Sequence, residues 1–197
     1  MIYTYQMLQE KYNNYGNPKT KIQRLVKSNK LLKLGKGIYD DNIHVDPILL
    51  SNVLYSPSYV SFETALYIYG LIPERVVNIT CATYNKNKKK IINTPIATYI
   101  YQDININAYP HGNTIIEQDG YSYMIALPEK ALLDTISKGI ICKNIKEMYE
   151  YLFDDLRINE ILFDQLDKSK LNELSKYYRS NNIRIFINMI NKEYNND

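Results

Sequence analysis

Residues 17–40 read NPKTKIQRLVKSNKLLKLGKGIYD, and this stretch contains two structural signals in close succession. Asn17 followed by Pro18 predicts a helix start, because Asn caps helices well and Pro fits the first helical turn. The next apolar residues have helical spacing and form a buried stripe: Ile22, Leu25 and Val26. Alternating apolar residues then flank a Gly-Lys-Gly centre at residues 35–37, which predicts a tight β-hairpin.

A second helix is expected just before this stretch. Thr4 is a suitable N-cap, and the residues that follow it at helical spacing are Tyr5, Leu8, Tyr12 and Tyr15. The polar segment 13–17 separates the two helices. Two short helices joined by a polar turn and followed by a hairpin are typical of a winged helix-turn-helix, in which the hairpin is the wing.

The exposed face of the helix after Pro18 carries the candidate DNA contacts. At 100° per residue, the side chains opposite the apolar stripe are Thr20, Gln23, Arg24 and Lys27. Arg and Gln suit guanine and adenine edges, whereas Lys and Thr suit phosphates. On the wing, Lys33 and Lys36 are predicted to approach the DNA backbone. The alternative is the ordinary solvated face of any helical hairpin, but this face is basic and almost free of acids.

The distribution of charge supports a separate basic module. The 197 residues have a formal charge of +3, with 24 Lys and Arg against 21 Asp and Glu. Residues 1–45 contain eight basic and three acidic residues, a net charge of +5, which leaves sixteen basic and eighteen acidic residues, or −2, in residues 46–197. We therefore predict a winged helix-turn-helix domain at 1–45 and an effector domain at 46–197.

The second domain is predicted to combine a sheet with a helical end. Patterns of alternating and β-branched residues predict strands, at residues 76–83, 96–102, 114–117 and 121–125. Pro128 opens a helix, and the chain is expected to be helical from Asn144 onward. The expected fold class is α+β: a winged helix-turn-helix, then a mixed, mainly antiparallel sheet with a helical C-terminal region.

No catalytic, metal or cofactor site is predicted. The two histidines, His44 and His111, are isolated from each other and from the cysteines. Glu129 and Asp134 lie five residues apart on one helix and faintly resemble a nuclease carboxylate set, but such spacing is common on helix surfaces.

A further basic surface is considered in the second domain, formed by Lys86, Lys88, Lys89 and Lys90. These side chains either extend a nucleic-acid surface or form a solvated hairpin tip.

The remaining sequence features predict a cytoplasmic protein without a membrane partner. No apolar run approaches the roughly 18 residues of a membrane span, and the first residues lack the pattern of a signal peptide. The two cysteines, Cys81 and Cys142, have no metal-type spacing and are expected to be reduced.

Three further stretches carry a family resemblance: PSYVSFETAL at 57–66, YGLIPERV at 69–76 and IALPEKALLD at 125–134. Together with the N-terminal pattern, they resemble the AbiEi antitoxins of abortive-infection, type IV toxin–antitoxin systems. The resemblance covers about residues 4 to 140. Several relatives have more Arg on the wing, where this chain has Lys33 and Lys36, so base or phosphate geometry there is expected to be looser.

The resemblance implies two activities. The winged helix would bind double-stranded DNA at inverted repeats in its own promoter and repress the operon. The C-terminal domain would neutralise a cognate AbiEii-like nucleotidyltransferase toxin without forming a stable complex with it. Glu74-Arg75 and Glu129-Lys130 are expected to form structural ion pairs or a functional surface. The alternatives are a plain winged-helix regulator and a nuclease or RNA-modifying enzyme with a site around Glu129 and Asp134.

Overall fold

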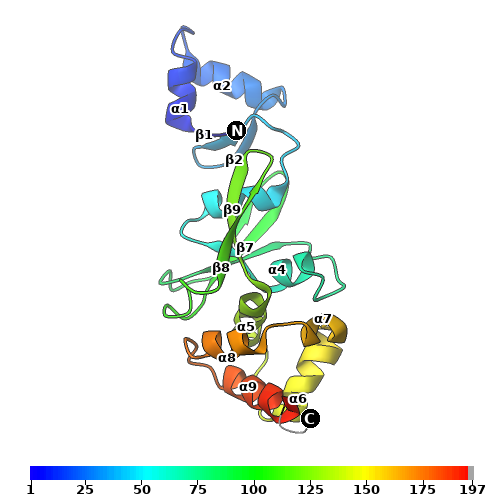
Figure 1. The fold of residues 1–197 in the computed structure, drawn as a ribbon. Coiled ribbons are helices and arrows are strands. Elements are labelled where there is room, and N and C mark those ends of the chain that lie inside the picture. The colour runs from blue at the N-terminus through cyan, green and yellow to red at the C-terminus, as the bar shows by residue number, and fades with distance from the viewer. Residues whose placement is uncertain (195–197) are drawn as a thin grey trace.

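The computed structural model describes residues 1–194, and the fold is α+β. Three parts follow one another along an elongated molecule (Figure 1). A small sheet with two helices forms one end, a larger sheet forms the middle, and a group of helices forms the other end. Residues 195–197 of the predicted second domain lie outside the described residues.

The N-terminal part contains two helices and a three-stranded antiparallel sheet with the order β1-β3-β2. Its elements are β1 (Ile2–Thr4), α1 (Tyr5–Lys11), α2 (Pro18–Lys27), β2 (Leu32–Gly35) and β3 (Ile38–Asp40). The predicted helices and hairpin are confirmed, whereas β1 was not expected from the sequence. A strand of three residues is too short to show a clear alternating pattern, and β1 exists because it pairs with β3.

Local chemistry explains these boundaries. The side chains of Thr4 and Asn17 accept hydrogen bonds from the backbone N–H groups of Met7 and Thr20, at 3.2 and 3.1 Å, so both predicted caps are confirmed. Gly37 has a φ of +75° in the turn between β2 and β3, a conformation that glycine adopts without strain. Its carbonyl accepts from the backbone N–H of Tyr5 at 2.8 Å, which ties the hairpin to the start of α1.

The middle part is built on a six-stranded mixed sheet with the order β6-β7-β5-β4-β9-β8. Pairs β5·β7 and β4·β9 are parallel, and the other three pairs are antiparallel. The strands are β4 (Tyr59–Val60), β5 (Ile79–Thr83), β6 (Lys90–Asn93), β7 (Thr98–Asp103), β8 (Asn113–Gln118) and β9 (Tyr121–Ala126). The helical elements are η1 (Pro47–Leu50), α3 (Ser51–Leu54), α4 (Phe62–Ile68) and α5 (Pro128–Lys138).

The sheet differs from the prediction at three places. The strand predicted from residue 76 begins only at Ile79, and the carbonyl of Asn78 accepts from the Thr64 hydroxyl instead of a neighbouring strand. Strands β4 and β6 were not predicted. β4 has two residues, and β6 is formed mostly by exposed residues at the sheet edge, so neither has a recognisable pattern.

The C-terminal part is helical, as predicted. It contains α6 (Ile145–Glu150), a π-helical segment η2 (Tyr151–Asp155), α7 (Glu160–Asp164), α8 (Lys168–Ser175) and α9 (Asn181–Tyr194). α5 connects this part to the sheet, since it contacts α4 on one side and α8 and α9 on the other.

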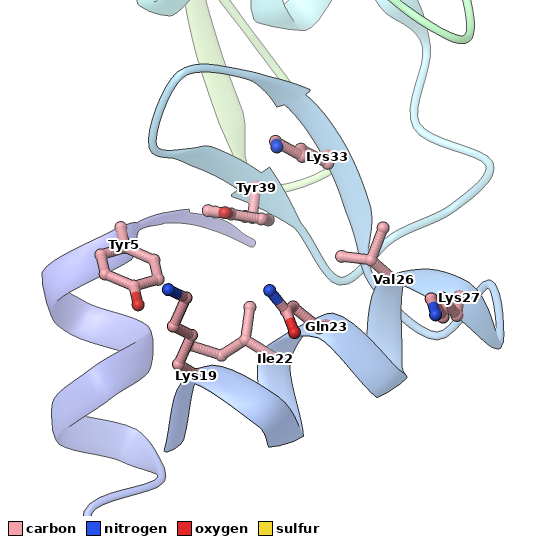
Figure 2. A pocket seen from close by; sticks show the side chains of 8 residues that line it. All are labelled: Tyr5, Lys19, Ile22, Gln23, Val26, Lys27, Lys33 and Tyr39. Atoms are coloured by element: carbon pink, nitrogen blue, oxygen red, sulfur yellow. The ribbon is translucent and has the colours of Figure 1, made fainter. Parts of the chain in front are cut away.

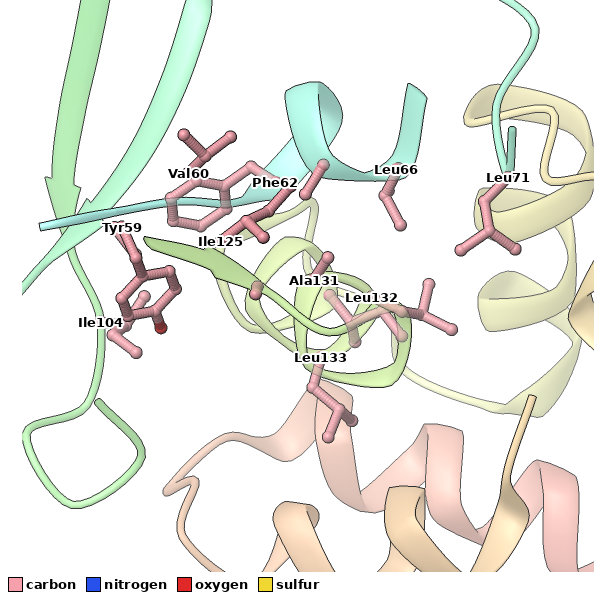
Figure 3. Close-up of a cluster of buried hydrophobic side chains, with 14 of the residues drawn as sticks. Tyr59, Val60, Phe62, Leu66, Leu71, Ile104, Ile125, Ala131, Leu132 and Leu133 are labelled. Atoms are coloured by element: carbon pink, nitrogen blue, oxygen red, sulfur yellow. The ribbon is translucent and has the colours of Figure 1, made fainter. Parts of the chain in front are cut away.

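Buried apolar residues form two separate clusters. The larger one runs through the middle and C-terminal parts and also includes Leu34 of β2; Figure 3 shows part of it, with Phe62, Leu66 and Leu132 among its members. The smaller cluster belongs to the N-terminal part alone and consists of Tyr3, Leu8, Ile22, Leu31 and Tyr39. The N-terminal part thus has its own small core.

A polar contact joins the N-terminal part to the large sheet. The hydroxyl of Tyr121, at the start of β9, lies 2.9 Å from both carboxylate oxygens of Asp40 in β3. Asp40 is fully buried and also accepts from the backbone N–H of Asn42 at 2.8 Å. This contact fixes the end of the small sheet against the large one.

Candidate nucleic-acid interface

Helix α2 presents the predicted contact residues on its exposed face. Gln23, Arg24 and Lys27 are exposed and Thr20 is half-buried, whereas Ile22 is buried. The apolar side of the helix packs on the small core, so the polar side necessarily faces outward. Two hollows flank this face, and they divide the predicted residues between them.

The first hollow lies between α2 and the β2–β3 hairpin and has a volume of about 520 Å³. Figure 2 shows Lys19 and Gln23 rising from α2 toward the rings of Tyr5 and Tyr39, with Lys33 on β2 across from them. Lys27 also lines this hollow. Among the residues that the structure describes, its walls contain three lysines and no acidic residue.

The second hollow lies on the other side of α2 and has a volume of about 530 Å³. Thr20 and Arg24 line it, together with three residues that were not predicted as DNA contacts: Tyr15, Lys21 and Lys30. The ammonium of Lys21 lies 4.6 Å from the centre of the Tyr15 ring, which is cation–π distance. Lys36 lies in the hairpin turn, is exposed, and lines neither hollow.

Sequence reasoning missed Lys19, Lys21 and Lys30 as members of this surface. Lys19 lies one helical turn before Gln23, so the same helical periodicity of 100° per residue could have predicted that Lys19 belongs to this surface. Lys30 follows α2 in sequence and lines the second hollow because the chain turns back after the helix: the backbone N–H of Lys30 donates to the carbonyl of Leu25.

The acidic residues near this region do not compete with the lysines. Asp40 is buried and bonded to Tyr121, and Asp41 accepts from the Tyr3 hydroxyl at 2.9 Å. That hydroxyl in turn accepts from the ammonium of Lys11 at 2.8 Å, and this hydrogen bond raises the pKa of Lys11. The positive charge of residues 1–45 therefore concentrates on α2 and the hairpin.

The predicted basic surface at Lys86–Lys90 is only partly free. Lys86 donates from its ammonium to the carbonyl of Ser56 at 3.2 Å, and its backbone N–H donates to Asp103 at 2.6 Å. Lys88 and Lys90 are exposed, and Lys89 lines a hollow on the large sheet. The run is therefore a bent connection into β6 whose four lysines have different environments.

Glu129 and Asp134 do not lie on a helix surface, and that interpretation was wrong. Asp134 is fully buried and accepts four hydrogen bonds: Oδ1 from Lys130 at 3.0 Å and Tyr178 at 2.6 Å, and Oδ2 from Tyr59 at 2.9 Å and Ser61 at 2.7 Å. Burial lowers the pKa of Lys130, while the neighbouring carboxylate opposes that shift.

Glu129 is also buried and contacts the N-cap residue and first turn of α8. It accepts from the backbone N–H of Asp167 at 3.2 Å and from the ammonium of Lys170 at 3.5 Å. The expected pair Glu129-Lys130 is therefore wrong, because each residue has a different partner. The same holds for Glu74, whose ion-pair partner is Arg157 rather than Arg75. The two buried carboxylates, Asp134 and Glu129, therefore join α5 to neighbouring segments of the chain.

The remaining reactive side chains do not gather into a site. His44 is exposed, and the ring of His111 stacks on Tyr177 with centroids 3.8 Å apart. Both cysteines are free and buried, and burial raises the pKa of each thiol. Within residues 1–194, no group of His, Cys, Asp and Glu is arranged to hold a metal ion, and no helix is long and apolar enough to cross a bilayer.

Comparisons with known proteins define the fold more than the function. No family model matches the chain. The crystal structure of the Rv2827c protein from Mycobacterium tuberculosis is similar to it with a TM-score of 0.54 and 13% identity, over 89% of this chain and 66% of that one, just under two thirds of its length. At this identity the match establishes a shared fold.

A sequence match of 30% identity over 173 residues is found with "Putative histone-lysine N-methyltransferase 1" of Plasmodium falciparum (isolate 3D7). It covers 80% of this chain but spans only 2% of that protein. A match to so small a part does not carry the named activity to this chain.

Proposed function

We propose that residues 1–45 form a winged helix-turn-helix that binds double-stranded DNA, with α2 as the recognition helix and the β2–β3 hairpin as the wing. The observation that carries this proposal is the hollow lined by Lys19, Gln23 and Lys27 of α2 and Lys33 of β2, with no acidic residue among the described residues that line it. A phosphate backbone is recognised by lysines placed on both a helix and a neighbouring hairpin.

The exposed residues of α2 and the hairpin suit different contacts. Gln23 and Arg24 are exposed near the middle of the helix and can form paired hydrogen bonds with base edges in the major groove. Lys27, Lys33 and Lys36 supply point charges for phosphates. Thr20 lies one helical turn before Arg24, and its hydroxyl is also suited to a phosphate. Lys19, Lys21 and Lys30 widen this positive surface beyond the residues predicted from the sequence.

One module of this size contacts only a few base pairs, so useful affinity requires two copies on repeated half-sites. We therefore propose binding to inverted repeats in the protein's own promoter, with repression of the operon as the result. The resemblance to AbiEi antitoxins supports this proposal, since it includes the N-terminal pattern.

For residues 46–197 we propose antitoxin activity in the cytoplasm against an AbiEii-like nucleotidyltransferase toxin, without a stable complex. The support is the resemblance carried by residues 57–66, 69–76 and 125–134. The last stretch contains the buried Lys130 and Asp134, so part of the resemblance lies in residues that hold the fold together.

The DNA proposal is tested by fluorescence anisotropy with a duplex from the region upstream of the gene. Arg24→Ala plus Lys27→Ala is expected to weaken binding by about 1–3 kcal/mol for each base that is no longer recognised, or about 5- to 150-fold. The matched control, Lys146→Ala plus Lys176→Ala, removes the same charge from exposed positions of the C-terminal part and is expected to change binding little. Equal losses of affinity in both variants would show that the protein binds DNA through non-specific electrostatic attraction, and would contradict the assignment of α2 as the recognition helix.

The antitoxin proposal is tested by co-expression of the full chain with a nucleotidyltransferase-like toxin encoded beside its gene. Rescue of growth is expected from the wild type and also from the Arg24→Ala, Lys27→Ala variant, because the proposed activities reside in different parts of the chain. A wild-type protein that binds its promoter and fails to rescue would be a plain winged-helix regulator.

A further inference from the structure

A hollow of about 370 Å³ lies on the large sheet, away from the N-terminal part. Thr80 on β5 and both Ile100 and Gln102 on β7 line it, and these neighbouring parallel strands are in register, Thr80 opposite Ile100. Its volume lies within the range of about 300–1,000 Å³ typical of small-molecule sites. None of the proposed DNA contacts lines it.

Two lysines from distant parts of the sequence meet at this hollow. Lys89 precedes β6 and Lys138 ends α5, and both are exposed. Within residues 1–194, neither ammonium group has a hydrogen bond or an ion pair. Of the described residues that line the hollow, one is acidic, the half-buried Glu63. The hollow therefore offers two positive charges to an anionic group.

Two amide side chains in the same hollow also lack partners among the described residues. Gln102 on β7 and Asn78 before β5 are both half-buried, and neither side-chain amide forms a hydrogen bond there. Ile100 and Val77 provide apolar surface beside them. A bare inorganic anion would use the lysines alone, whereas a planar heterocycle with hydrogen-bonding edges would also use the amides and the apolar surface.

Phe62 also lines the hollow, and its backbone is held in a strained conformation. Phe62 has a φ of +56°, which is unusual for a bulky residue, although its ring is 1% exposed and packed in the core. Thr80 maintains this geometry: its hydroxyl donates to the Ser61 carbonyl at 2.8 Å and accepts from the backbone N–H of Thr64 at 3.1 Å. Strain of this kind concentrates at binding sites with rigid walls.

We propose that this hollow binds a 5′-nucleotide, either free or as the unpaired end of a nucleic-acid strand. Lys89 and Lys138 bind the phosphate, and the amides of Asn78 and Gln102 contact the edge of the base over Ile100. The Glu63 carboxylate accepts hydrogen bonds from ribose hydroxyls. This site is independent of the proposed DNA interface, since no residue is shared between them.

The test is calorimetric titration of the full chain with the four ribonucleoside 5′-monophosphates, the matching nucleosides and inorganic phosphate. At least one monophosphate is expected to bind more tightly than either its nucleoside or phosphate. Lys89→Ala plus Lys138→Ala is expected to weaken that binding about tenfold or more, because both charge-assisted hydrogen bonds to the phosphate are removed. The matched control, Lys88→Ala plus Lys90→Ala, is expected to bind like the wild type.

A third variant separates nucleotide recognition from simple anion binding. Asn78→Leu plus Gln102→Leu is expected to weaken nucleotide binding while phosphate binding stays unchanged. The ligand is a strand end if a 5′-phosphorylated single-stranded hexamer binds more tightly than the mononucleotide and if Lys89→Ala plus Lys138→Ala abolishes this extra affinity. Otherwise the ligand is a free nucleotide. Absence of nucleotide binding, or equal losses of affinity in the two lysine variants, would overturn the proposal.

Discussion

Replacement of Asp134 by Ala is expected to destabilise the chain severely. The Asp134 carboxylate is fully buried and is the common acceptor for Lys130, Tyr178, Tyr59 and Ser61. These donors come from α5, the segment after α8, β4 and the residue before α4. One carboxylate therefore joins the large sheet to the C-terminal helices.

The magnitude follows from what the substitution leaves behind. The side chain of Lys130 is 0% exposed, and in Asp134→Ala its ammonium would remain buried without a counter-charge. Removing one partner of a buried ion pair costs about 3–5 kcal/mol. For a chain of this size that loss of stability lowers the melting temperature by roughly 6–20 °C.

The assay is urea unfolding followed by circular dichroism at pH 7, with Glu150→Ala as the matched control. Glu150 forms an ion pair with Lys146 at 3.7 Å with the same four-residue spacing, but the two side chains are 51% and 86% exposed, so its removal is expected to change stability by less than about 0.5 kcal/mol. Adding Lys130→Met to Asp134→Ala is expected to restore part of the stability. A loss of about 1 kcal/mol or less in Asp134→Ala would refute the assignment of a buried charged pair.

The pH dependence gives a second test of the same pair. Burial lowers the pKa of Lys130, and removal of the Asp134 carboxylate, which opposes this shift, lowers that pKa further. Below the ordinary lysine pKa of 10.5 there is a pH range in which Lys130 is protonated in the unfolded chain but not in the folded chain. This range is wider in the variant than in the wild type. Stability therefore rises with pH over that range, and the difference from wild type narrows from pH 7 toward pH 10.

Three further substitutions probe single positions by urea unfolding. Tyr121→Phe removes the hydrogen bond to Asp40 and is expected to destabilise by about 1.5–3 kcal/mol at pH 7. Burial raises the pKa of Tyr121 from 10 to about 12, so its contribution disappears as pH rises between these values, and wild type and variant should converge there. Asn17→Ala removes the cap of α2 and is expected to cost about 0.5–2 kcal/mol. Gly112→Ala, at a φ of +71° with tight contacts, is expected to cost about 1–3 kcal/mol, whereas Gly16→Ala, in open space, should be nearly neutral.

The helices and the hairpin of the N-terminal part, but not β1, were predictable because their signals are local. Thr4 and Asn17 cap the helices that follow them, and Gly37 occupies the turn where only a residue without a side chain is unstrained. Each of these effects acts within three or four residues. The exposed face of α2 also follows from helical periodicity, so Gln23, Arg24 and Lys27 were correctly placed on the outside.

The middle sheet was less predictable because its edges depend on distant partners. The β-branched pattern at residues 76–78 favours a strand, but Thr64 binds the carbonyl of Asn78 and no strand pairs there. Conversely, β6 (Lys90–Asn93) has only four residues, mostly exposed and without an alternating pattern, and it is a strand because β7 provides a partner. Pairing across the sheet outweighed local preference at both places.

The sequence by itself determined the local elements and the concentration of positive charge in residues 1–45, because caps, turns and helical spacing operate over a few residues. Only the tertiary structure decided that Asp134 is a buried acceptor rather than a surface carboxylate, since its four donors lie up to 75 residues away. It also decided that Lys89 and Lys138 share one hollow. Burial and the meeting of distant side chains depend on packing, and no local pattern specifies either.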